Sequence, residues 1–146
     1  MENITIFDYY DEDSKKPKKV YLEIGAYQDN GRLYVGLVTA EDHELFMDLT
    51  VNLQRKLNGK NQAFIDGFAS CKERAAFIEA SGLARPLGYT VQSGYGKYPA
   101  YEFNEERLRE LAPKEYAEFE KAYYDHHPEE NAGREIQKSP EKQRGR

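Results

Sequence analysis

The stretch KVYLEIGAYQ-DNG-RLYVGLVTA, residues 19–40, holds the strongest folding signal in the chain. Two runs of alternating apolar residues flank the pair Asn30-Gly31. Asn-Gly between two such runs is typical of a β-hairpin, because a type I′ turn needs positive φ at both of its central residues. With this pair in the turn, Ile24 pairs with Leu37, and both lie on one apolar face, as a half-buried sheet requires.

The opposite face of this hairpin is the first candidate contact surface. In the predicted register Tyr27 faces Tyr34 and Gly25 faces Gly36, and Tyr21 lies on the same side. Two facing glycines leave a notch, since glycine has no side chain to pack. A helix or tyrosine ring of the same chain fills this notch, or else it forms a shallow aromatic-walled groove for a partner or small ligand.

Neighbouring segments extend the hairpin into a larger sheet. Residues 4–9 form a predicted strand, and residues 45–53 alternate in a pattern that matches the hairpin if Leu37 pairs with Met47. We therefore expect an antiparallel meander with one buried face.

Helices are expected in the second half of the chain. Ser70 and Glu73 form a capping box for a helix over residues 71–81, which Gly82 ends. Asn104 caps a second helix, and Pro113 starts a third, because proline fits the start of a helix but not its interior.

Residues 88–103, GYTVQSGYGKYPAYEF, are rich in glycine and tyrosine. They do not form a phosphate loop, because Val91 occupies the position of the first glycine and Tyr98 that of the serine or threonine. The dinucleotide-binding pattern fails at Pro99. The alternation instead predicts a strand, a turn at residues 93–96 and a second strand. This element supplies the second candidate contact surface, Tyr95, Lys97, Tyr98 and Tyr101.

These elements predict an α+β fold: an antiparallel meander sheet of four to five strands, packed by one short helix and a C-terminal helical pair. The length of 146 residues suits one domain, which we place at residues 1–128. Residues 129–146 are mostly charged or polar, with Ile136 as their only large aliphatic residue, and are predicted to be a disordered tail.

Composition excludes several classes of function. The chain has one cysteine, and its start shows no basic segment followed by an apolar run. No apolar run approaches the roughly 20 residues that a membrane span needs. These features predict a cytoplasmic protein without membrane contact. The net charge of −5 disfavours direct nucleic-acid binding, because phosphate contacts dominate that affinity. The lysines of residues 15–19 follow the acidic residues 11–13, and the two runs are interpreted as a solvated loop of opposed charges.

The sequence gives little support for a metal site or a catalytic site. The pair His126-His127 is the best metal candidate, but adjacent residues on a helix point about 100° apart. We interpret it as a frayed helix end and predict no metal and no cofactor. His43, with Cys71 or a tyrosine, is the remaining acid–base candidate, and the sequence predicts no enzyme.

Four stretches together resemble a family of small uncharacterised proteins: YLEIGAYQDNGRLYVGL, DLTVNL, FIEASGLARPLG and QSGYGKYPAYEFN. That family, a domain of unknown function, is encoded on conjugative transposons and plasmids of gut Firmicutes. The resemblance covers residues 18–104. It implies a bacterial accessory protein of a mobile genetic element and supplies no catalytic residues.

The leading hypothesis is a non-catalytic protein-interaction module with an unknown protein partner. Its contact surface would use the tyrosines of the first hairpin or the loop near Tyr95, since exposed aromatic residues are favoured anchors at interfaces. An alternative is an inhibitor of a host defence nuclease, an acidic decoy built from Asp8, Asp11, Glu12, Asp13, Glu23, Glu41, Asp42 and Glu44. A small-molecule enzyme is the third hypothesis.

Overall fold

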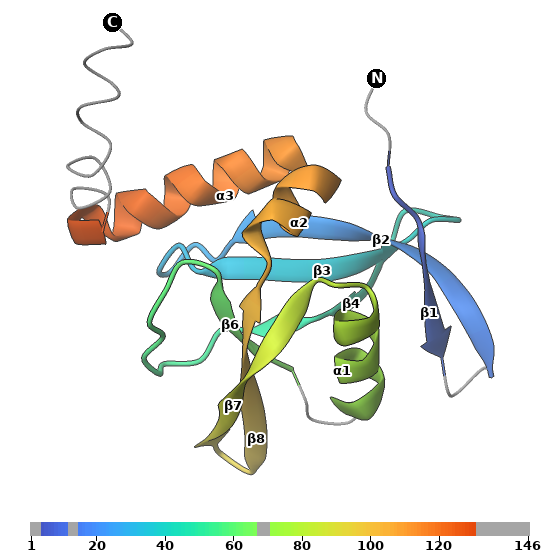
Figure 1. Cartoon of the computed structure of the whole chain (residues 1–146), viewed down its shortest axis with the longest axis horizontal. Helices are drawn as coiled ribbons and strands as arrows, with labels where there is room; N and C mark the ends of the chain where they lie inside the picture. Colours follow the sequence, from blue (N-terminus) through green and yellow to red (C-terminus); the bar gives the residue numbers. More distant parts are fainter. Residues whose placement is uncertain (1–3, 12–14, 67–70, 131–146) are drawn as a thin grey trace, which may run out of the picture.

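The computed structural model describes residues 4–11, 15–66 and 71–130 (Figure 1). One four-stranded antiparallel sheet, sheet A, has the order β1-β2-β3-β4. Its strands are β1 (Phe7–Asp11), β2 (Lys16–Ala26), β3 (Leu33–Thr39) and β4 (Leu45–Asp48). The predicted antiparallel meander is confirmed, including the pairing of Leu37 with Met47.

A second four-stranded antiparallel sheet, sheet B, has the order β5-β6-β8-β7. Its strands are β5 (Thr50–Val51), β6 (Gln62–Ile65), β7 (Ala84–Ser93) and β8 (Gly96–Phe103). The α+β class is confirmed, but the strands form two sheets instead of one. The predicted strand over residues 45–53 is divided at Leu49, whose amide bonds to Val35 in sheet A while its carbonyl accepts from Asp66 beside β6.

The register predicted for the first hairpin is wrong by two residues. Ile24 pairs with Val35, and Gly25 pairs with Tyr34 instead of Gly36. The turn is longer than two residues, because Gly31 donates to the carbonyl of Tyr27, and only Gly31 of the Asn-Gly pair has positive φ, at 72°. A shift of two preserves the side-chain alternation, so the predicted apolar face survives.

The predicted helices are present. They are α1 (Cys71–Ala80), α2 (Glu105–Leu111) and α3 (Pro113–His126). The Asn104 side chain accepts from the amide of Arg107, as expected for the cap of α2. The capping box of α1 involves Ser70, which lies outside the described residues, as does the tail beyond Glu130.

One hydrophobic core joins the two sheets and the three helices. Its members come from the apolar face of sheet A, from sheet B and from all three helices, and include Ile24, Val35, Phe77, Tyr101, Phe103, Leu108, Tyr116 and Phe119. Helix α3 lies along β2, and the β7–β8 hairpin projects away from α3 (Figure 1). Within residues 4–11, 15–66 and 71–130, no helix has the length and apolar character needed to cross a membrane.

Candidate functional site

The tyrosine face of sheet A is held by internal hydrogen bonds. Tyr34 donates to the Asp48 carboxylate over 2.7 Å, and the Tyr27 hydroxyl lies 3.0 Å from Thr50 Oγ1. The two rings meet edge to face at 5.6 Å. Burial, followed by the contact with Asp48, raises the pKa of Tyr34, which keeps its hydroxyl protonated as the donor.

The expected notch is filled by the protein itself. Gly36 faces Glu23 across the strands, and the ring of Tyr34 lies over Gly36, so that a Cβ there would stand 2.9 Å from the ring carbon Cζ. The first of the two interpretations, a tyrosine of the same chain in the notch, is therefore correct. Gly25 and Gly36 do not form a groove.

Tyr21 lies beside His43 at the end of this face. Its hydroxyl is 3.1 Å from His43 Nδ1, within reach of a proton transfer, and the contact is exposed to solvent. Catalytic dipoles act most strongly where water is excluded. The contact between Tyr21 and His43 is open to water, which disfavours it as a catalytic site. The structure does not describe the side chain of Cys71.

The β7–β8 hairpin places its predicted contact residues in different environments. Gly94, with φ of 59°, and Tyr95 form a two-residue turn that leaves Tyr95 fully exposed, at 101% of its reference area. Lys97 is exposed and Tyr98 lies over Gly96. Tyr101 does not belong to the surface, because it is buried in the core and donates to Glu79.

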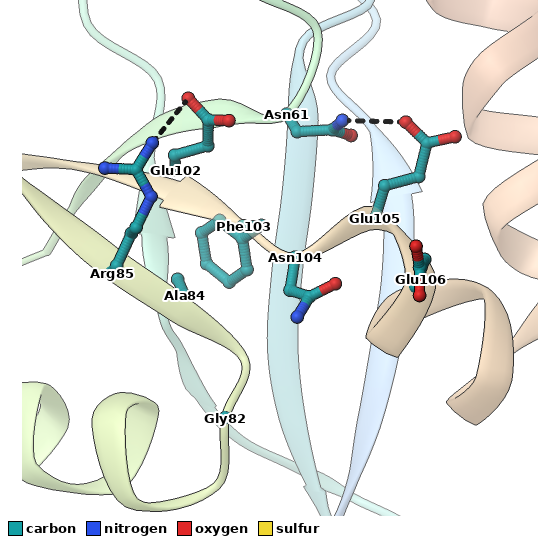
Figure 2. Close-up of a pocket in the computed structure, with 9 residues that line it drawn as sticks. All are labelled: Asn61, Gly82, Ala84, Arg85, Glu102, Phe103, Asn104, Glu105 and Glu106. Atoms are coloured by element: carbon teal, nitrogen blue, oxygen red, sulfur yellow. Dashed lines mark hydrogen bonds and ion pairs between the residues drawn. The ribbon is translucent and has the colours of Figure 1, made fainter.

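A pocket of about 490 Å³ opens at the base of this hairpin, where β8 leads into α2 (Figure 2). Nine residues line it: Asn61, Gly82, Ala84, Arg85, Glu102, Phe103, Asn104, Glu105 and Glu106. The sequence identified Gly82 and Asn104, each only as a residue at the end of a helix. The polar run Asn104-Glu105-Glu106 directly after a strand was the sequence feature that could have indicated this pocket. The pairing of β6 with β8, which brings Asn61 beside that run, is long-range and could not be read from the local sequence.

The carboxylates of this pocket mostly have partners. Glu102 accepts from Gln62 over 3.2 Å and lies 3.8 Å from Arg85. Glu105 accepts from Asn61 over 3.0 Å and from Arg109 over 2.6 Å. Burial opposes the ionisation of Glu105, but the bonds from Asn61 and Arg109 and the charge of Lys60 outweigh it and lower its pKa to about 2.

Beside the pocket, four charged side chains form what we call the Lys60 cluster: Lys60, Glu105, Arg109 and Glu120. Lys60 Nζ lies 2.5 Å from Glu120 Oε2, and both side chains are largely buried, at 12% and 13% exposure. Arg109 also reaches Glu120, at 2.9 Å. The cluster therefore fastens the loop before β6 to α2 and α3, which is a structural role.

The histidine pair at the end of α3 is divided between separate contacts. His126 Nδ1 lies 3.0 Å from the carbonyl of Ala122, and His127 Nε2 lies 2.9 Å from the carbonyl of Asn30. Among the residues that the structure describes, no three histidine, cysteine, aspartate or glutamate residues gather as a metal site.

The described acidic residues proposed for a decoy lie on β1, on β2 and in the β3–β4 connection, and two of them face lysines. Asp8 forms an ion pair with Lys19 across β1 and β2, and Asp11 pairs in register with Lys16. Glu23 lies within β2 opposite Gly36, whereas Glu41, Asp42 and Glu44 belong to the β3–β4 connection. Glu12 and Asp13 lie outside the described residues. A phosphate-like row needs regularly spaced, unneutralised carboxylates, and the placement of these groups counts against it.

Comparison with known proteins gives one match. No curated protein and no solved structure matches the chain. The family model described as a domain of unknown function, DUF4313, matches residues 21–123, which include both sheets from β2 onward and most of α3. The chain therefore belongs to the DUF4313 family.

Proposed function

We propose that the chain is a non-catalytic protein-interaction module and an accessory protein of a mobile genetic element. The observation that carries the interaction role is the projecting β7–β8 hairpin with Tyr95 fully exposed at its tip. Tyr89, which the sequence interpretation did not single out, adds a second exposed ring on β7. The mobile-element role follows from the sequence resemblance.

The hairpin has the properties of a binding anchor. A tyrosine ring has a large apolar area and few rotatable bonds, so that it gains contact area at a low entropic cost. A two-residue turn in register with its strands fixes the backbone that carries this ring before a partner arrives. Preorganisation of this kind favours affinity, because less freedom is lost on binding. The polar groups in the pocket and on sheet A are largely engaged with each other, which favours a non-catalytic role.

Photo-crosslinking in the native host tests this proposal. A photoreactive amino acid replaces Tyr95 in one variant and the exposed Glu118 of α3 in a matched control. We expect one protein to be captured in stoichiometric yield from position 95 and not from position 118. Equal capture from both positions, or no capture from position 95, would contradict the proposal.

A further inference from the structure

Charge is unevenly distributed along the chain. Residues 49–65 and 84–101 contain no aspartate or glutamate and five basic residues, Arg55, Lys56, Lys60, Arg85 and Lys97. The net charge of the whole chain is −5, so the remaining residues carry −10. These two segments, which include β5, β6, β7 and most of β8, are thus a positive region of an acidic protein.

The structure brings three of these cations to the β7–β8 hairpin and the loop that contacts it. Lys60 is used in the Lys60 cluster and Arg85 is paired with Glu102, whereas Arg55, Lys56 and Lys97 are exposed. The Arg55 guanidinium donates to the carbonyl of Gln92 over 2.5 Å, which fixes the loop before β6 against β7. We call these three cations, with Tyr89 and Tyr95, the basic hairpin surface.

The second half of β7 is an edge strand within this surface. In sheet B, β7 pairs with β8 on one side and is the last strand of the order. In an antiparallel strand, the main-chain N–H and C=O groups of successive residues alternate between bonding to the neighbouring strand and pointing away from it. The Gln92 carbonyl accepts from Arg55 and so points away from β8. The main-chain groups of Thr90, two residues earlier, point the same way. Pro99, which pairs with Thr90, has no N–H to offer it.

We infer that this edge of β7 binds an extended, acidic segment of a protein partner by strand addition. Thr90 and Gln92 present outward main-chain groups, and strand addition uses such groups for affinity. The incoming strand would take the Gln92 carbonyl from Arg55, and the freed guanidinium would pair with a carboxylate of the segment, with Lys97 nearby on β8. The inference rests on the proposed function and names the chemistry of its partner.

A peptide suits this surface better than a polynucleotide. Outward main-chain groups on β7 recognise another peptide backbone. Nucleic-acid affinity depends on the number of phosphates neutralised, and this surface has only three exposed cations. The remaining charge of −10 would repel a long polyanion that extends past the hairpin.

Fluorescence anisotropy with the full chain tests the inference. The probes are a labelled octapeptide of alternating valine and glutamate, its valine–lysine counterpart and a 12-nucleotide oligothymidylate. We expect the acidic peptide to bind at least about tenfold more tightly than the basic one, with an affinity that falls as salt rises. Reversing charge with Arg55→Glu and Lys97→Glu should weaken that binding about tenfold. A matched control, Lys114→Glu with Lys121→Glu on α3, replaces two exposed lysines, changes the net charge equally and should leave that binding unchanged.

A backbone variant separates strand addition from simple charge attraction. Thr90→Pro removes the outward N–H but no bond to β8, so we expect an unchanged circular dichroism spectrum and about tenfold weaker peptide binding. The inference would be overturned if both peptides bind equally well, if the oligothymidylate binds more tightly than the acidic peptide, or if Thr90→Pro leaves the affinity for the acidic peptide unchanged. If position 95 still captures a partner in the host, only the acidic-strand inference fails; if it captures none, the proposed function fails as well.

Discussion

Gly36 lacks a side chain because Tyr34, two residues earlier on β3, occupies the space that a side chain would need. The substitution Gly36→Ala would place a methyl group 2.9 Å from Cζ of Tyr34, which is too close for a carbon contact. Displacement of the ring would also break its bond to Asp48. We expect a loss of about 1–3 kcal/mol in the free energy of unfolding, measured with urea. The matched control is Gly25→Ala, whose Cβ would lie 3.9 Å from Tyr34 and should change stability by less than about 0.5 kcal/mol.

Glu105 should make the stability of the protein dependent on acidity. Its pKa falls from 4.5 to about 2 in the folded chain, because hydrogen bonds from Asn61 and Arg109 outweigh the cost of burial. A depressed pKa stabilises the fold above pH 4.5, and this stabilisation is lost as pH falls from 4.5 towards 2. About a third of the side chain is exposed, so solvent screening reduces the contribution to about 1–2 kcal/mol. The difference in unfolding free energy between the wild type and Glu105→Gln should therefore shrink as pH falls from 6 to 3; a constant difference would contradict this.

Among the elements, the first hairpin shows what local sequence can and cannot predict. Alternation correctly predicted both strands and their shared apolar face. The register failed because Asn30 serves distant partners: its side chain donates to Asn52, and its carbonyl contacts His127, 97 residues away. Asn-Gly propensity describes an isolated turn, and these tertiary contacts favour a longer one. Neither partner can be inferred from residues 19–40 alone.

The β7–β8 hairpin depends on one glycine at its turn. Gly94 has φ of 59°, where a side chain strains the backbone, although no atom would touch an added Cβ. We expect Gly94→Ala to cost about 1–2 kcal/mol and to broaden the NMR signals of the hairpin amides. Tyr95→Ala is the control, since Tyr95 is fully exposed without positive φ; it should leave stability within about 0.5 kcal/mol of the wild type. Equal losses in both variants would show that the turn is not the source of the strain.

For the whole molecule, the positions of the proposed contact residues were predicted in part. Tyr95, Lys97 and Tyr98 lie on the hairpin that alternation predicted, but Tyr101 is in the core because β8 runs from the projecting tip into the body between β6 and β7. The long-range pairing of Phe64 with Ala100 and the contact of Arg55 with Gln92 build the pocket and the basic hairpin surface. Alternation reports which face of a strand is buried, not which strand lies beside it.

The division into two sheets raises the question of whether they unfold together. Leu49 stands at the junction with its side chain fully buried, and its backbone bonds to both sheets. Because one core spans both sheets, Leu49→Ala should cost about 2–5 kcal/mol. The protection of the Val35 and Phe64 amides against hydrogen exchange, one in each sheet, should fall by the same free energy. The exposed Leu45 provides the control, since Leu45→Ala should change protection little. Loss of protection in only one sheet would show two independent folding units, and the β7–β8 hairpin would then belong to a domain separate from the tyrosine face.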